Sequence, residues 1–287
     1  MSDFLLYLTN GLVIGVIYAL SALGVALIVG MMNVVNFAHG ELYVLAGYFS
    51  ALFAQALGLH PAIAMVLGAL SIFLFGLVIE RLLIRPTYGN DMYSLIVTFI
   101  LSIVLQNAYL LIFGPYPQKP PNLITGATDV FGLFMYGNQR LMGFVLGVVV
   151  IAAFFLLLKR TWFGRVVQAV STDREVAALM GVNPERVNLL GFGLGCALAG
   201  AAGVILTPIF PVTPNIGVGV SLTAFVVVVL GGMGSFLGCL VGGVLLGVVE
   251  NLGSAYISSA YKQLFSFVIL IVVLFVRPAG LFGRRQM

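Results

Sequence analysis

Long apolar segments recur along nearly the whole chain, and their length is the feature that most constrains the fold. Runs such as FVLGVVVIAAFFLLL, residues 144–158, are uniformly apolar rather than alternating. A helix needs about 20 apolar residues to cross roughly 30 Å of hydrocarbon, whereas barrel strands show alternating segments of about ten residues. The chain is 61% hydrophobic and 8% charged, against about 25% charged in soluble domains. The sequence therefore predicts an all-α, multi-pass integral membrane protein.

The charges outside these segments predict how the chain is oriented in the membrane. Apolar segments are expected at about 8–31, 41–58, 62–83, 93–113, 141–158, 188–209, 220–233, 236–252 and 263–280. Most Lys and Arg follow the third segment, lie between the fifth and sixth, or close the chain. The positive-inside rule places these regions in the cytoplasm. About eight transmembrane helices and a cytoplasmic C-terminus follow, provided that the region 220–252 is interrupted.

Polar or glycine-rich breaks interrupt one apolar region in each half of the chain. The early break is Asn36–Gly40, and the late break is GGMGS, residues 231–235. Paired breaks of this kind indicate inverted repeats, in which unwound half-helices near the midplane line a substrate path. Helical spacing would place polar and small residues of the early region on one face, as a pathway or a close helix contact: Asn33, Asn36, Gly40 and Gly47.

Two ionisable residues, His39 and Glu41, lie at the early break. An unpaired charge at membrane depth costs at least about 2.5 kcal/mol, so such residues are usually functional. Two interpretations remain open: the pair lines or gates a substrate pathway, or it lies hydrated at the cytoplasmic interface. If Glu41 is buried, we expect His39 or a neighbouring subunit as its partner. Glu250, in contrast, is expected at an external helix end in a hydrated or capping role.

The segment 159–187 is the most charged part of the chain and predicts a short amphipathic helix. Thr172 and Glu175 have the spacing of a capping box, and Gly181 is a helix stop after the apolar residues between them. Asn183 followed by Pro184 is typical of the start of the next helix. The pattern fits an ordinary interfacial helix or a docking helix for a soluble partner.

Three blocks of sequence resemble the branched-chain amino acid ABC transporter permeases of the LivH type. They are NFAHGELYVLAGYFSA, GRVVQAVSTDREVAALMGVNPERV and VVLGGMGSFLGCLVGGVLLGVVENL, in the same order and spacing as in that family. The resemblance runs from about residue 8 to 283. It implies one transmembrane permease domain, residues 1–287, with 159–187 as a cytoplasmic coupling loop. Gln168 departs from the pattern, because such proteins often carry arginine there.

The breaks, the amphipathic segment and the resemblance together predict two sets of site residues. The first would form the substrate pathway: Asn33, Asn36, Phe37, His39, Gly40, Glu41, Tyr43, Gly231, Gly232, Gly234 and Ser235. The second would couple the permease to an ATPase: Gly164, Arg165, Thr172, Asp173, Arg174, Glu175, Ala178, Leu179, Met180 and Gly181. No catalytic residue, metal site or nucleic-acid partner is expected.

The implied assembly is an importer in the bacterial inner membrane that moves branched-chain or hydrophobic amino acids by alternating access. Its other parts would be a second related permease subunit, two cytoplasmic ATP-binding subunits and a periplasmic substrate-binding protein. The lysines of this chain are not followed by Ser or Thr, as a phosphate-binding GxxxxGK[ST] loop requires. ATP and Mg²⁺ would therefore bind to the partner subunits, and this chain would need no cofactor.

Other functions are weighed against this one. The same class of transporter also serves urea, amides or aromatic acids, and a self-contained channel or carrier for a small solute is a further alternative. A channel would not need the capped cytoplasmic helix, and a proton-coupled carrier usually needs more buried carboxylates than Glu41 alone. An intramembrane enzyme is disfavoured because the chain has no HExxH motif.

Overall fold

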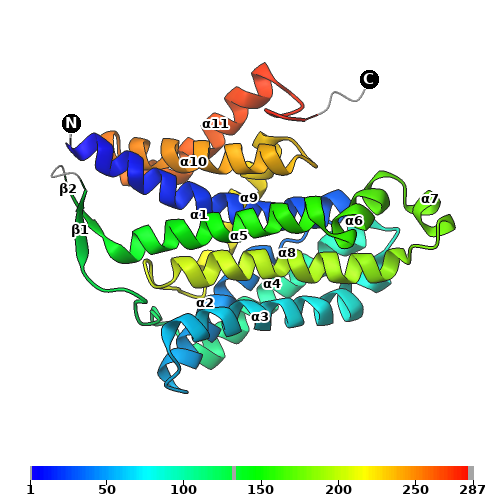
Figure 1. Cartoon of the computed structure of the whole chain (residues 1–287), viewed down its shortest axis with the longest axis horizontal. Helices are drawn as coiled ribbons and strands as arrows, with labels where there is room; N and C mark the ends of the chain where they lie inside the picture. Colours follow the sequence, from blue (N-terminus) through cyan, green and yellow to red (C-terminus); the bar gives the residue numbers. More distant parts are fainter. Residues whose placement is uncertain (1, 131–133, 284–287) are drawn as a thin grey trace.

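A computed structural model describes residues 2–130 and 134–283 and shows an elongated bundle of helices (Figure 1). In this described part, seven helical segments are long and apolar enough to cross a membrane. Five of them are single α-helices: α1 (Ser2–Met32), α4 (Asp91–Phe113), α5 (Asn138–Arg160), α8 (Pro184–Leu206) and α10 (Phe236–Tyr256). The other two membrane-length segments combine an α-helix with 3₁₀ turns, and one of them also with a π-helical turn. Helix α3 (Pro61–Ile79) continues through the π-helical turn η1 (Glu80–Ile84) and the 3₁₀ turn η2 (Arg85–Thr87), and η3 (Ser259–Tyr261) leads into α11 (Lys262–Val276).

Shorter elements complete the fold. Helices α2 (His39–Gln55) and α9 (Ile216–Gly231) lie within the bundle, while α6 (Trp162–Thr172) and α7 (Arg174–Leu179) project from one end. An antiparallel hairpin of β1 (Ala127–Val130) and β2 (Phe134–Gly137) lies at the opposite end, beside the start of α1 (Figure 1). Each predicted apolar segment corresponds to a helix, so the prediction of an all-α, multi-pass membrane protein is confirmed.

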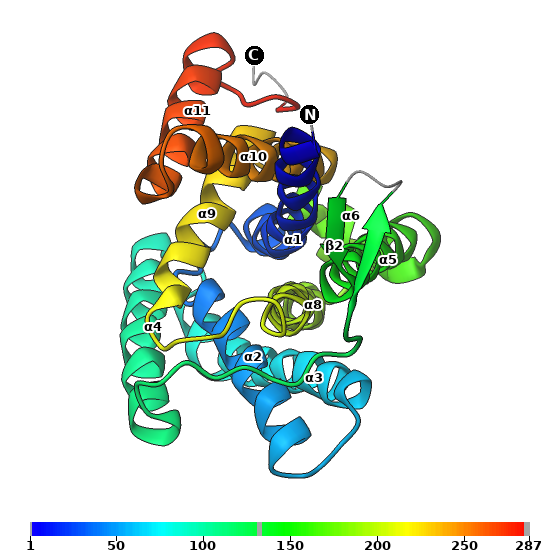
Figure 2. The same ribbon diagram turned by 90° about the vertical axis from the view of Figure 1, so that its left-hand side faces the viewer.

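Helices α1 and α8 form the centre of the bundle, with α2 and α3 on one side and α9, α10 and α11 on the other (Figure 2). They are the most buried of the membrane-length helices. They cross where Gly24 faces Gly195: a Cβ on Gly195 would lie 2.8 Å from the Gly24 carbonyl oxygen. Glycine allows this approach because side chains there would push the two backbones apart.

The crossing of α1 and α8 carries a repeated sequence pattern. Leu-Gly-x-Ala-Leu occurs at residues 23–27 and again at 194–198, on helices that run in opposite directions (Figure 1). Each helix is followed by an irregular segment, 33–38 or 207–215, and then by a short helix, α2 or α9. This arrangement pairs the early break with 207–215, and not with 231–235 as the sequence pattern predicted.

The two predicted breaks are present as interruptions of helix. Helix α1 ends at Met32, and Asn33 takes a positive φ of 52° before α2 begins at His39. The predicted single helical face for Asn33, Asn36, Gly40 and Gly47 is therefore wrong, because the helix stops within that set. The late break is a turn between α9 and α10, where Gly232 and Gly234 adopt positive φ.

Candidate translocation and coupling sites

The early break brings the N-terminus of α2 against α9. The Gly40 N–H donates to the Ser221 hydroxyl over 2.7 Å, and that hydroxyl donates to the Phe37 carbonyl over 3.0 Å. A Cβ on Gly40 would overlap the carbonyl oxygen of Gly217. The Phe37 N–H in turn lies 3.3 Å from the hydroxyl of Thr98 on α4. Irregular backbone at membrane depth needs such partners, because lipid offers none.

Glu41 is fully buried at this junction and is held by α4 rather than by His39. One carboxylate oxygen accepts from the Gln106 amide over 2.9 Å and from the Ser102 hydroxyl over 3.3 Å. The other oxygen has no hydrogen-bond partner among the described residues. The carboxylate also lies against the glycine backbone at Gly217, in the first turn of α9. A carboxylate is stabilised there by the positive end of the helix dipole.

His39 points elsewhere. Its Nε2 lies 3.0 Å from the Ser21 carbonyl oxygen on α1, and the residue is fully buried. The predicted pairing of His39 with Glu41 is wrong, because side chains two residues apart on a helix do not face each other. The hydrated-interface interpretation of this pair is also wrong, since neither side chain reaches solvent in this structure.

The predicted pathway residues separate into different places. Phe37, Gly40 and Glu41 lie at the α2–α9 junction, and the Phe37 ring centroid is 5.6 Å from that of Phe225 on α9. Asn36 is buried in the break itself, whereas His39 faces α1 and the Tyr43 backbone faces Gly203 on α8. Asn33 is exposed at the end of α1. Gly234 and Ser235 instead line a cavity of about 600 Å³ beside α5 and α6, together with Gly164 and Thr172 of the coupling set. Gly231 and Gly232 are buried beneath the last described residues of the chain.

The coupling segment folds as two short helices with side-chain caps. The Asp173 carboxylate accepts from the N–H groups of Glu175 and Val176 over 2.9 and 3.0 Å, so Asp173 is the N-cap of α7. Thr172 is the last residue of α6, and its hydroxyl donates to the Gln168 carbonyl. The predicted capping box of Thr172 and Glu175 is therefore wrong, because α6 extends through Thr172.

The other two helix signals of this segment are confirmed. Gly181 has a φ of +83° just beyond α7, a left-handed conformation that ends a helix. The Asn183 side chain accepts from the Arg186 N–H over 3.1 Å, and Pro184 is the first residue of α8. Two caps and a glycine stop thus fix the position of α7 between α6 and α8.

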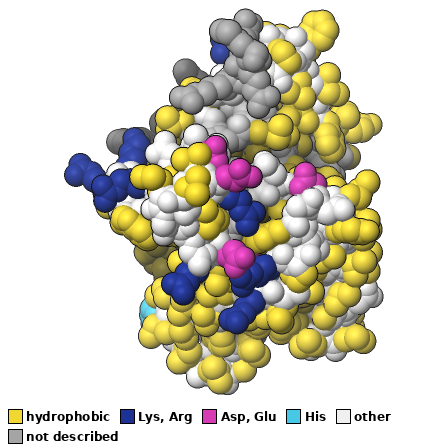
Figure 3. Space-filling model, turned by 90° about the vertical axis from the view of Figure 1, so that its right-hand side faces the viewer, with side chains coloured by type: hydrophobic (Ala, Val, Ile, Leu, Met, Phe, Trp, Pro, Cys, Tyr) yellow, Lys and Arg dark blue, Asp and Glu magenta, His cyan; other side chains and the backbone are white. Residues whose placement is uncertain are grey.

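Helix α7 presents an apolar surface to solvent. Leu179 and Met180 are 86% and 81% exposed, and Val176 is 54% exposed, while Ala177 is buried beneath them. Figure 3 faces this end of the molecule, where Lys and Arg side chains gather among hydrophobic ones. We call Val176, Leu179 and Met180 the α7 knob. An exposed apolar group of this kind, rimmed by charge, is typical of a protein contact surface.

Arg174 connects α7 to the far end of α3. Its guanidinium carbon lies 5.3 Å from the centroid of the Tyr88 ring, within the range of a cation–π contact. The Tyr88 hydroxyl donates to Glu80 in the π-helical turn η1 over 2.5 Å. Burial, and then the neighbouring Glu80, raise the pKa of Tyr88, so the phenol stays protonated and can donate. Nearby, Arg85 and Glu185 form an ion pair between η2 and α8.

Sequence reasoning missed Tyr88 and Glu80. The available signal was weak: the basic residues after the third apolar segment were interpreted only as markers of orientation. The Leu-Gly-x-Ala-Leu repeat was a stronger signal, and it would have located the central helix crossing.

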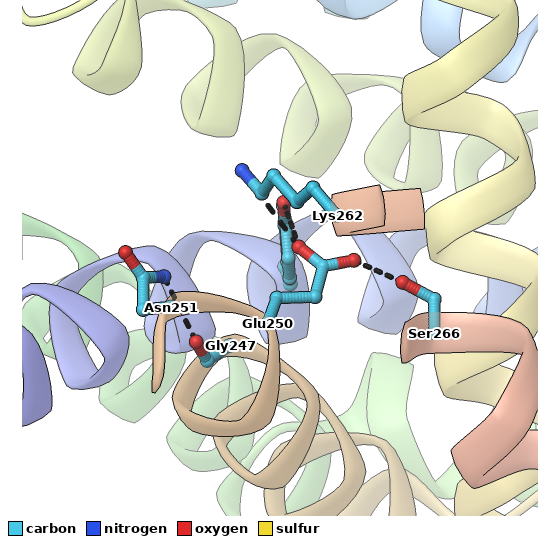
Figure 4. A network of polar contacts seen from close by, with 6 residues as sticks. Gly247, Glu250, Asn251, Lys262 and Ser266 are labelled. Atoms are coloured by element: carbon cyan, nitrogen blue, oxygen red, sulfur yellow. Dashed lines mark hydrogen bonds and ion pairs between the residues drawn. The ribbon is translucent and has the colours of Figure 1, made fainter. Parts of the chain in front are cut away.

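A second buried carboxylate, Glu250 on α10, faces Lys262 and Ser266 of α11 (Figure 4). It is 2% exposed, accepts from the Tyr18 hydroxyl over 2.8 Å and from Ser266, and lies 3.8 Å from the Lys262 ammonium. The predicted hydrated role is wrong, because η3 and α11 fold back over this end of α10. The carboxylate joins α1, α10 and α11.

Among the described residues, seven membrane-length helical segments, helices interrupted inside the bundle and a capped amphipathic segment at one end define a multi-pass membrane protein. Residues 7–274 match the family described as branched-chain amino acid transport system / permease component, and the chain belongs to that family.

Curated relatives agree over nearly the full length. The chain is 35% identical to the high-affinity branched-chain amino acid transport system permease protein LivH of Escherichia coli K12, covering 99% of this chain and 96% of that protein. It is 35% identical to BraD of Pseudomonas aeruginosa, covering 99% and 97%. A chain of PsaBC from Streptococcus pneumoniae in complex with Fab has the same fold, with a TM-score of 0.51, 15% identity and coverage of 96% and 94%.

The family membership bears out the resemblance seen in the three sequence blocks. The protein is a permease subunit of an ABC transport system, so it works within a transporter complex. The family has neither catalytic activity nor a cofactor of its own, which confirms both predictions.

Proposed function

We propose that this chain carries branched-chain or other hydrophobic amino acids across the bacterial inner membrane by alternating access, driven by ATP on partner subunits. The names of the relatives LivH and BraD support this substrate. The proposed orientation places α6, α7 and the C-terminus in the cytoplasm, in keeping with the positive-inside rule. The assembly would contain a second related permease subunit, two cytoplasmic ATP-binding subunits and a periplasmic binding protein.

The observation that carries the coupling proposal is the contact of Arg174 with Tyr88 beneath the exposed α7 knob. The knob would insert into a groove on an ATP-binding subunit, as apolar helix faces commonly do. Movement of α7 would then reach η1 through Tyr88 and Glu80, and reach α8 through the Asn183 cap. A π-helical turn is a common site of local rearrangement in helices.

The α2–α9 junction is the proposed gate. In the state described here, Glu41 and His39 are fully buried, so the pathway is closed at this level. Separation of α2 from α9 would break the Gly40–Ser221 hydrogen bond and expose the carboxylate of Glu41. An amino acid carries an ammonium group, and the oxygen of Glu41 that lacks a partner is suited to accept from it.

Transport by the reconstituted complex tests this proposal. The chain is co-expressed with its candidate ATP-binding, permease and binding-protein partners, and uptake of radiolabelled leucine into proteoliposomes is measured with and without ATP. ATP-dependent leucine uptake is expected. Uptake of urea, amides or aromatic acids in place of leucine would reassign the substrate. Solute uptake by this chain alone, without any associated ATPase, would overturn the permease mechanism in favour of a channel.

A further inference from the structure

The cavity of about 600 Å³ lies away from the α2–α9 junction, at the end of the bundle that carries α6. Its walls come from the end of α1, the end of α5, α6 and the 233–237 turn. Leu27, Phe155 and Phe236 contribute apolar surface from the membrane-length helices. Lys159, Gln168 and Ser171 contribute polar groups from the neighbourhood of α6. The cavity is therefore amphipathic, with a cationic side chain beside apolar walls.

The charged side chain among the described residues that line the cavity is cationic, that of Lys159. No Asp or Glu is among its described lining residues, and within the described ranges no carboxylate forms an ion pair with Lys159. A cavity with a lysine and no acidic side chain favours an anionic occupant. Its apolar walls favour an occupant that also carries a hydrocarbon chain, because free phosphate would leave that surface without a partner.

Lys159 lies at the end of a membrane-length helix, where the headgroup region of a membrane is expected. Lys159 and Arg160 end α5, and Trp162 follows with 67% of its surface exposed. Basic residues and tryptophan concentrate at membrane–water interfaces. Basic pockets between transmembrane helices on the cytoplasmic side are a recognised setting for anionic lipid headgroups.

We propose that this cavity binds an anionic phospholipid, with the phosphate at Lys159 and an acyl chain along the walls formed by α1, α5 and α10. Assignment to the cytoplasmic leaflet rests on the orientation in the proposed function, whereas the lipid contact itself does not. The occupant would touch both α6 and the 233–237 turn, so it would brace the segment that carries α7.

Retention of lipid by the purified full-length chain tests the site without any transport assay. The chain is reconstituted in nanodiscs of phosphatidylglycerol and phosphatidylcholine, extracted into detergent, and the retained lipid is counted by native mass spectrometry. Lys159→Gln is expected to lower phosphatidylglycerol retention about fivefold, the effect of one basic residue at an anionic membrane surface. Lys159→Arg is expected to restore it. Arg160→Gln is the matched control, because Arg160 is adjacent and exposed but does not line the cavity.

A cavity-filling variant tests the acyl-chain part. Gly30 lines the cavity, and a Cβ added there meets nothing within 4 Å. Gly30→Leu is therefore expected to fold normally by circular dichroism and to retain less of both lipids.

Equal losses of phosphatidylglycerol in Lys159→Gln and Arg160→Gln, or no loss in Lys159→Gln, would overturn the proposal. So would displacement of phosphatidylglycerol by millimolar inorganic phosphate, which would indicate a site for free anions.

Discussion

The backbone N–H of Gly40 donates a 2.7 Å hydrogen bond to the hydroxyl of Ser221, which lies 181 residues further along the chain. This bond joins the first turn of α2 to α9, immediately after the early break. The same hydroxyl donates to the Phe37 carbonyl. A single serine therefore gives hydrogen-bond partners to the Phe37 carbonyl, within the break, and to the Gly40 N–H, at the start of α2. Opening of this junction is the step that we assign to the gate.

Ser221→Ala is expected to lower both the stability and the transport rate. It leaves the buried Gly40 N–H without a partner, at a cost of about 1–3 kcal/mol. Gly40→Ala is expected to be worse, because its Cβ would overlap the Gly217 carbonyl oxygen and force α2 from α9. Thermal unfolding in detergent and leucine uptake are the measurements. Gly219→Ala, also on α9, is the control, since its Cβ lies in open space and it does not line the cavity; an equal loss there would contradict the packing argument.

Tyr88→Leu is expected to uncouple ATP hydrolysis from uptake. The substitution removes the ring under Arg174 and the hydroxyl that donates to Glu80, so movement of α7 no longer reaches η1. The expected result is ATPase activity close to the wild-type value with reduced leucine uptake, measured in the same proteoliposomes. Tyr93→Leu is the matched control, because Tyr93 is 61% exposed. Normal coupling in Tyr88→Leu would rule out this route.

Replacement of the α7 knob is expected to weaken binding of the ATP-binding subunits without harming the fold. Leu179→Ser with Met180→Ser removes apolar groups that are 86% and 81% exposed, and surface changes of this kind usually alter stability by less than about 0.5 kcal/mol. Co-purification of an ATPase with the membrane chain is the readout. Leu111→Ser, at a site 88% exposed on α4, serves as the comparison. Undiminished co-purification of the double variant would exclude the knob as the docking surface.

Glu250→Ala is expected to loosen α11 from α10 and α1. It removes the acceptor of the Tyr18 and Ser266 hydroxyls, each of which costs about 1–3 kcal/mol when buried without a partner. Glu250→Gln keeps one of the two acceptor oxygens and replaces the other, and the charge that faces Lys262, by a neutral NH2 group, so a smaller fall in unfolding temperature is expected. Asn251→Ala provides the neighbouring control. The assignment fails if all three variants unfold at the same temperature.

Glu41→Gln separates a binding role from a packing role for this carboxylate. The amide oxygen of Gln can still accept from Gln106 and Ser102, so the unfolding temperature is expected to stay near the wild-type value. The charge that would attract a substrate ammonium is lost, and leucine uptake is expected to fall at least about tenfold. Full uptake by this variant would show that Glu41 only joins α2 to α4 and α9.

Some features of the site were predictable because they depend on local sequence. The stop at Gly181 and the cap of Asn183 before Pro184 follow from the backbone preferences of neighbouring residues. The cap at Asp173 was misplaced by one residue, since Thr172 and Asp173 are both good capping residues and the length of α6 decides between them. Tyr88 was missed because its partner Arg174 is distant in sequence.

The sequence by itself determined the class of the protein, the helical segments and the places where they break. The hydrocarbon core imposes these through segment length and the need for internal hydrogen bonds. Only the tertiary structure decided which break faces which helix, that Glu41 pairs with α4 rather than with His39, and that Glu250 lies under α11. Local propensities carry no information on such contacts, because they depend on how distant helices pack.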